Sequence, residues 1–175
     1  FILKNRTQLE KQVIPAGVTN APAIKIAHYA RNNEEAALTK ALDEIQFSLV
    51  NGEATSVLLL GRYRFVRPDS LEAYQASYPD QSIRYMTVHA SKGLEADHVV
   101  ILRAVSDRLG FPSEIVDDPV LSMVLPEPEQ FEHAEERRLF YVALTRAKNS
   151  VTVLADREKP SVFVRELINQ SEYGA

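Results

Sequence analysis

The chain has 175 residues, of which 45% are hydrophobic and 25% charged, and its formal net charge is -4. This length and composition are typical of one globular domain with a complete core. The absence of cysteine excludes disulfides and thiolate zinc sites, and the absence of a long apolar run excludes a membrane span, so we expect a cytoplasmic protein.

Residues 1–22 have the pattern of a helical remnant followed by a linker that contains two prolines. Because the first residue is Phe1 rather than Met, we expect a piece of a longer protein. A single domain is predicted over 23–175. Its first elements are predicted to be a strand over 23–28, a helix that starts at 34 and ends near 51–52, a buried strand over 56–60 and a short helix that starts around 68–70.

The second half of the domain continues the alternation of strands and helices. The predicted elements are a strand over 83–88, a strand over 99–102, an irregular acidic insert at about 103–132, a helix over 133–148, a strand over 150–154 and a final helix over 160–169. Strands that alternate with helices predict a mainly parallel sheet with helices on both faces, which makes a three-layer α/β sandwich.

Charge is segregated along the sequence. Residues 61–92 contain five Lys or Arg against three acids, whereas residues 93–136 contain two against eleven. Because phosphate repels an acidic segment, the insert is predicted to be a solvated loop or a docking surface for a protein partner, rather than a DNA contact.

The chain lacks the parts of a nucleotide hydrolase that bind phosphate and magnesium. None of its six glycines is followed by Lys, so there is no Walker A loop, and no apolar strand ends in an acidic pair suited to Mg²⁺. The four His residues share no metal-ligand spacing. We therefore expect no ATP hydrolysis by this chain alone, and no metal site of its own.

The basic end of the predicted helix over 133–148 has two interpretations. In the first, Arg146 and Lys148 complement the negative end of the helix dipole. In the second, Arg146 is an arginine finger, whose guanidinium stabilises charge that develops on a transferring phosphate in a neighbouring site. Spacing alone leaves both interpretations open.

Two runs of sequence carry a specific resemblance. Residues 135–148 (EERRLFYVALTRAK) and 87–95 (TVHASKGLE) are similar to motifs VI and V of the UvrD/Rep family of superfamily 1 DNA helicases. Over 61–169 the chain resembles most the bacterial helicase IV members of that family. The resemblance implies a RecA-like fold of the P-loop NTPase type without its own Walker A, and it makes this chain the second motor domain.

The resemblance also implies how ATP is bound. Arg146 and Arg62 correspond to arginines that contact the γ-phosphate, and Glu95, with Gly93 two residues before it, corresponds to an acid that contacts the nucleotide. ATP and Mg²⁺ are then expected to be bound mainly by the N-terminal RecA-like domain of the same protein, which is the expected partner of this chain.

Three residues correspond to positions that contact single-stranded DNA: Thr87, His89 and Lys92. Thr87 and His89 are predicted at the carboxyl end of a parallel strand, where ligands gather in open α/β sheets. A hydroxyl, an imidazole and turn amides hold phosphate without reading base sequence. The alternatives are a hydrogen bond within the turn for His89 and a solvated surface position for Lys92.

The chain departs from the family pattern in two places. Many relatives have an aromatic residue that stacks on adenine immediately before the motif IV arginine, and this chain has Gly61, so base stacking is expected from Tyr63 or from the other domain. The interval from Arg62 to Tyr85 is also too short for the large accessory domain that many relatives insert there.

The resemblance predicts the C-terminal motor domain of an ATP-dependent 3′-5′ DNA helicase. One alternative is the motor domain of a helicase-like factor that remodels RNA polymerase or protein-DNA complexes. A second alternative is a RecA-like binding module without catalysis, against which the presence of Arg62, Glu95 and Arg146 counts.

Overall fold

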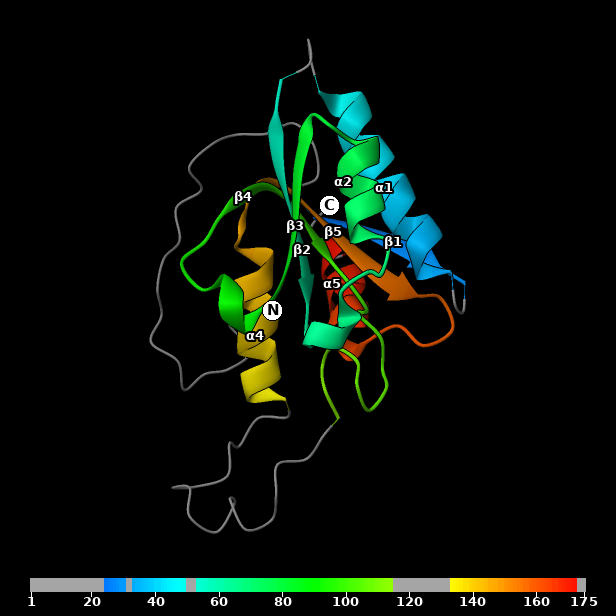
Figure 1. Ribbon diagram of the computed structural model, residues 1–175. Helices are drawn as coiled ribbons and strands as arrows, with labels where there is room; N and C mark the ends of the chain where they lie inside the picture. Colours follow the sequence, from blue (N-terminus) through cyan, green and yellow to red (C-terminus); the bar gives the residue numbers. More distant parts are fainter. Residues whose placement is uncertain (1–23, 31–32, 50–52, 115–132, 173–175) are drawn as a thin grey trace.

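Five parallel strands form the centre of the molecule (Figure 1). The computed structural model describes residues 24–30, 33–49, 53–114 and 133–172. The strands are β1 (Ile24–Tyr29), β2 (Thr55–Gly61), β3 (Gln81–Thr87), β4 (Ala96–Ile101) and β5 (Ala147–Asp156). They lie in the order β1-β5-β4-β2-β3, and every pairing between neighbours is parallel, which confirms the predicted sheet.

Helices cover both faces of this sheet (Figure 1). The helices are α1 (Glu34–Ser48), α2 (Leu71–Ser77), α4 (Ala134–Leu144) and α5 (Val162–Glu172), with short 3₁₀ turns η2 (Arg64–Val66) and η3 (His89–Ser91). In β2, Val57 and Leu59 pack toward α1 and α2, whereas Leu58 and Leu60 pack toward α4 and α5. A strand that is buried on both faces appears in the sequence as a continuous run of apolar residues, which is why β2 could be predicted.

Helix α1 shows how the sequence determines a local element. Its first turn carries two acids, which complement the positive end of the helix dipole. The buried positions Leu38, Ala41, Leu42 and Ile45 recur at spacings of three and four and form one apolar stripe against the sheet. The helix begins at residue 34 as predicted, and it ends at Ser48, a few residues before the predicted end near 51–52.

The predicted helix over 133–148 is wrong at its carboxyl end. Helix α4 ends at Leu144, and β5 begins at Ala147, which pairs with Ala96 of β4. The hydroxyl of Thr145 donates to the carbonyl of Val142 at 3.1 Å and closes the last turn. Pairing with a distant strand thus ends the helix early and makes β5 longer than the predicted 150–154.

The remaining predictions concern the insert and the N-terminus. Residues 103–114 contain no helix; an isolated bridge between Val105 and Pro160 ties this stretch to the rest of the domain, and a second bridge, Asp107 with Ser113, lies within the stretch. The rest of the insert, the predicted remnant over 1–22 and the predicted helix end near 51–52 lie outside the described residues. Within the described part, no helix has the length and apolar character that a membrane crossing requires.

Candidate nucleotide and DNA site

Arg62 directly follows β2 and is held by a carboxylate of α4. Its Nε donates to both carboxylate oxygens of Glu136, at 2.8 and 3.1 Å, and its Nη2 lies 2.7 Å from Oε1 of the same residue. The two side chains are only 20% and 12% exposed. A paired contact of this kind fixes the plane of the guanidinium as well as its position.

Tyr63 and Ser113 complete the surroundings of this ion pair. The guanidinium carbon of Arg62 lies 4.9 Å from the centre of the Tyr63 ring, within the range of a cation–π contact. The Tyr63 and Ser113 hydroxyls are 2.6 Å apart, and the backbone N–H of Ser113 donates to Oε2 of Glu136 at 2.9 Å. Three separate chain segments are thereby joined at the carboxyl end of β2.

Gly61 has no room for a side chain. A Cβ at this position would overlap the hydroxyl of Tyr85 and come within 3.0 Å of Cβ of Val66. The Tyr85 hydroxyl donates to the carbonyl of Tyr63, and burial raises the pKa of Tyr85 to about 12. In this structure the position of Gly61 therefore cannot take an aromatic side chain unless Tyr85 moves.

The segment between β3 and β4 contains the predicted DNA contacts. It starts at Thr87, whose Oγ1 accepts a hydrogen bond from the N–H of Ala90 at 3.4 Å. His89 and Lys92 are exposed, and within the described residues neither side chain makes a hydrogen bond or ion pair. The alternative of a turn hydrogen bond for His89 is therefore not what this structure contains. Gly93 has a φ of +83°, a left-handed conformation that favours glycine.

Arg146 lies in the turn between α4 and β5 and is bonded only to neutral acceptors. Its Nε donates to the carbonyl of Val142 at 3.0 Å, its Nη1 to the carbonyl of Leu94 at 3.3 Å, and its Nη2 to Oγ1 of Thr145 at 3.2 Å. No carboxylate pairs with it in the part of the chain that the structure describes. Arg146 does satisfy a helix-end carbonyl, as the first interpretation requires, but among the described residues no ion pair compensates its charge.

The two predicted phosphate arginines are held at opposite ends of α4. Arg62 contacts the first turn of α4 through Glu136, whereas Arg146 follows the last turn. The eight residues from Glu136 to Leu144, where α4 ends, correspond to about 12 Å of helix. Arg146 instead contacts the carbonyl of Leu94, which places it beside the exposed Glu95.

Two residues of this site were missed by the sequence reasoning. Glu136 was only counted among the acids of 93–136 and included in the motif VI run, and Ser113 was placed in an irregular insert. The available signal was weak, because the motif VI run contains Glu136 without giving it a role, and two acids in a first turn are normally explained by the helix dipole. The partner of Glu136 is 74 residues away in sequence, so only the fold reveals the pair.

Comparison with known proteins identifies the family. Residues 27–158 match the family described as UvrD-like helicase C-terminal domain. The chain belongs to this family. The predicted family resemblance is confirmed, and the parallel sheet with helices on both faces agrees with a RecA-like domain of a UvrD-like helicase.

Relatives of this helicase domain are much longer proteins. The chain is 37% identical over 169 residues to DNA helicase IV of Escherichia coli (strain K12), covering 97% of the chain and 24% of that protein. It is 36% identical over 115 residues to DNA helicase II of Haemophilus influenzae, covering 59% of the chain and 14% of that protein. It is 31% identical over 114 residues to ATP-dependent DNA helicase Rep of Escherichia coli, covering 59% of the chain and 15% of that protein. The chain thus spans about a quarter of the first relative and less of the others.

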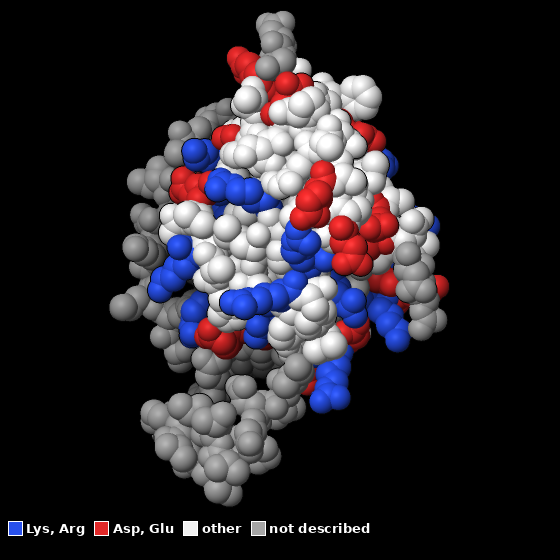
Figure 2. All heavy atoms as spheres, viewed as in Figure 1, with Lys and Arg blue, Asp and Glu red and all other residues white. Residues whose placement is uncertain are grey.

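Positive charge gathers on one face of the helicase domain. Figure 2 shows Lys and Arg side chains in a broken band across the middle of this face, with acids beside them. Exposed arginines of the segment 61–92 include Arg64, Arg67 and Arg84, and Arg67 pairs with Glu72. Such a face attracts phosphate more than the net charge of -4 suggests.

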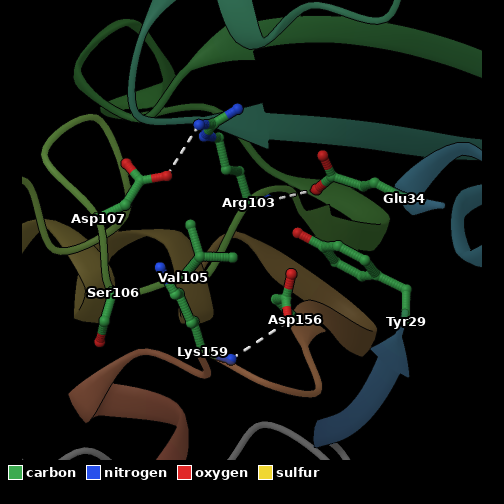
Figure 3. A pocket seen from close by; sticks show the side chains of 8 residues that line it. All are labelled: Tyr29, Glu34, Arg103, Val105, Ser106, Asp107, Asp156 and Lys159. Atoms are coloured by element: carbon green, nitrogen blue, oxygen red, sulfur yellow. Dashed lines mark hydrogen bonds and ion pairs between the residues drawn. The ribbon is translucent and has the colours of Figure 1, made fainter. Parts of the chain in front are cut away.

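A separate cavity of about 210 Å³ lies where β1 and β5 end (Figure 3). In this cavity the carboxylate of Glu34 accepts a hydrogen bond from the backbone N–H of Arg103 at 2.5 Å, and the side chain of Arg103 forms an ion pair with Asp107 at 2.9 Å. Burial raises the pKa of both Glu34 and Tyr29. None of the predicted site residues lines this cavity, and no sequence motif marks it, because its lining comes from several separate segments.

Proposed function

We propose that this chain is the second RecA-like motor domain of an ATP-dependent DNA helicase that moves 3′ to 5′ on single strands. The observation that carries the proposal is the state of Arg146, a cation held by neutral acceptors in a domain of a helicase family. An uncompensated guanidinium in a partly exposed turn gains the most from an incoming phosphate. The cytoplasmic location and the domain range 23–175 belong to the same proposal.

ATP is proposed to bind at the interface with the N-terminal RecA-like domain of the same protein. Within the described residues, no cluster of His, Asp or Glu is arranged to hold a metal ion, so Mg²⁺ is assigned to that other domain. When bound there, Mg²⁺ neutralises charge on the phosphates. The isolated chain is therefore proposed to lack ATPase activity.

The arginines of this domain supply charge to the reaction from across the interface. Arg146 acts as the finger that stabilises negative charge on the γ-phosphate in the transition state, and Arg62 makes a second phosphate contact. Glu95 and Gly93, which are exposed beside the Leu94 carbonyl that Arg146 contacts, are assigned to the nucleotide. Loss of the γ-phosphate then removes what both arginines hold, and the two domains separate.

Single-stranded DNA is proposed to contact the segment that follows β3. The exposed imidazole of His89 and ammonium of Lys92 have no partner within the described residues, which leaves both available to phosphate. Thr87 offers its hydroxyl at the carboxyl end of its strand. Contacts of this type bind the backbone and give no base specificity.

The experiment is DNA-stimulated ATP hydrolysis by the full-length protein with Arg146→Ala. We expect turnover to fall by about 10³-fold or more, as for removal of an arginine finger, with the far-UV spectrum unchanged. Lys148→Ala is the matched control, because Lys148 is an exposed cation two residues away and should leave turnover intact. Turnover like the wild type in Arg146→Ala would contradict the proposal.

Strand displacement by the same preparations tests what the hydrolysis drives. Unwinding of a duplex with a 3′ single-stranded tail is expected. ATPase activity without unwinding, together with displacement of a stalled RNA polymerase, would instead indicate a remodelling factor. An absence of ATPase in the wild type would indicate a binding module.

A further inference from the structure

We infer that Glu136 is a positioning residue, which holds the guanidinium of Arg62 in the orientation that phosphate contact requires. The inference rests on the proposed function, because it assumes that Arg62 contacts a phosphate of ATP. Glu136 itself would touch neither nucleotide nor DNA. It would act through Arg62 alone.

The first observation is the way in which the carboxylate engages the guanidinium. Glu136 binds the edge formed by Nε and Nη2, with distances of 2.8 Å from Nε to Oε1 and 2.7 Å from Nη2 to Oε1. An arginine has five N–H donors. This contact uses one donor on Nε and one on Nη2, which leaves the second donor of Nη2 and both donors of Nη1. Within the described residues, no acceptor contacts Nη1.

The free donors lie at the end of the guanidinium opposite the bonded edge. That end presents two parallel N–H groups, one from Nη1 and one from Nη2, which is the arrangement that binds phosphate oxygens in pairs. Glu136 and a phosphate can therefore be bound at once and need not compete. The carboxylate fixes one edge while the other faces outward.

The second observation is that Glu136 is fixed from its other side. The N–H of Ser113 donates to its Oε2 at 2.9 Å, and the Ser113 hydroxyl lies 2.6 Å from the Tyr63 hydroxyl. The Tyr63 ring in turn lies against the guanidinium of Arg62. Carboxylate and ring together restrict both the direction and the plane of the arginine.

The neighbouring acid shows that this arrangement is specific. Glu135 precedes Glu136 in the same helical turn, but its side chain is 57% exposed and pairs with Arg138 one turn later on the surface. Surface pairs of this type contribute little. If an acid in this turn served only the helix dipole, both positions would be equivalent, and they are not.

The test is DNA-stimulated ATPase of the full-length protein with Glu136→Gln. The amide keeps the size of the side chain, but it loses the negative charge and one of the two acceptor oxygens, and its NH₂ group opposes the N–H donors of Arg62 or of Ser113. We expect kcat to fall at least tenfold, with an unchanged DNA concentration for half-maximal stimulation. Glu136→Asp should lose less, because the charge remains, and Glu135→Gln should match the wild type.

A double-mutant cycle with Arg62→Ala separates positioning from a general structural effect. If Glu136 acts through Arg62, then Glu136→Gln should produce no further fall in kcat once Arg62 is absent. Falls that multiply in the double variant would overturn the inference, as would an increase in kcat, which would mean that Glu136 competes with phosphate. If Glu136→Gln does not fold, the same cycle is run with Glu136→Asp.

The outcomes also distinguish the inference from the proposed function. A strong loss in Arg146→Ala and Arg62→Ala with wild-type turnover in Glu136→Gln would remove only the inference. Wild-type turnover in Arg62→Ala would remove the phosphate role of Arg62 and the role of Glu136 with it, while leaving Arg146 to be decided by its own variant.

Discussion

The sheet has a carboxyl edge and an amino edge, where the parallel strands end and begin, and these two edges use polar residues in different ways. At the carboxyl edge, Arg62 is held by Glu136 but keeps unused donors. At the amino edge, the carboxylate of Asp97 accepts from the N–H and the hydroxyl of Ser56 at 2.9 and 2.6 Å, and His98 bonds Ser150 at 2.8 Å. The amino-edge groups bond to one another, and the bonds from Ser56 and Thr55 all end on Oδ2 of Asp97.

This difference separates residues that act on a ligand from residues that stabilise the fold. A polar group with spare hydrogen-bonding capacity at a partly exposed edge is available to a ligand, whereas a closed set of bonds contributes only to the folded state. Substitutions at the amino edge should therefore change stability, and substitutions at the carboxyl edge should change activity as well.

The largest effect on stability is expected from Asp97→Ala. This change removes the acceptor of two strong hydrogen bonds from Ser56 and a longer one from Thr55, and bonds to a charged acceptor contribute about 1.5–3 kcal/mol each before solvent exposure reduces them. We expect unfolding in urea to lose about 2–3 kcal/mol. The ATPase activity per folded molecule should stay within about twofold of the wild type, because substitutions at distant sites that share no partners rarely affect one another.

Asp97→Asn is the control for this prediction. The amide retains one oxygen acceptor for Ser56, so its loss should be about half that of Asp97→Ala. Hydrogen bonds from Ser56 lower the pKa of Asp97, which means that they favour the charged form. If either Asp97 variant loses more ATPase activity than its loss of folded protein explains, the distinction between the two edges is wrong.

A smaller effect is expected from Gly61→Ala at the carboxyl edge. The added methyl group would overlap the Tyr85 hydroxyl, and overpacking of this kind costs about 1–2 kcal/mol. Because Tyr85 donates to the Tyr63 carbonyl, a displaced Tyr85 should also disturb Arg62 and lower ATPase activity per folded molecule. Urea unfolding and ATPase measured on the same preparations separate the two effects.

Tyr85→Phe provides the matched background. Removal of the hydroxyl makes room for the methyl group, so Gly61→Ala should cost less stability in Tyr85→Phe than in the wild type. An equal cost in both backgrounds would show that contact with Val66, rather than with Tyr85, determines the effect.

The sequence predicted the strands better than the ends of helices. The apolar run over 56–60 is continuous because β2 is buried on both faces, and this pattern needs no knowledge of partners. The end of α4 depends on Ala147 pairing with Ala96, a contact between distant parts of the chain. Local spacing favoured helix through this turn, and tertiary pairing prevailed.

The sequence predicted the motif residues of the site but not the contacts that those residues make. Motif resemblance singled out Arg62 and Arg146, but it did not show that one is paired and the other is not. Glu136 carries no local signal, since an acid at a helix start has an ordinary explanation. Contacts across 74 residues are determined by the packing of α4 against the end of β2, which no run of sequence reveals.

The smallest expected effect concerns His98 at the amino edge. Burial lowers the pKa of His98 below its ordinary value of 6.5, so folding favours the neutral ring. A lowered pKa of the folded state contributes stability above pH 6.5 that is lost as the pH falls through the folded value. The pKa of Asp97 is lowered from its ordinary value of 3.8, so Asp97 stays charged over the pH range in which His98 titrates.

The measurement is the urea midpoint of the wild type and of His98→Gln between pH 7 and pH 5. Burial raises the pKa of Glu34, so the contribution of Glu34 to the stability of the protein falls as the pH rises, opposite to the contribution of His98. Only the difference between the two proteins therefore isolates the histidine. We expect the wild type to lose more stability than His98→Gln on acidification. Parallel profiles would mean that the closed set of bonds around Ser150 tolerates a charged ring, and that the amino edge is less closed than its distances indicate.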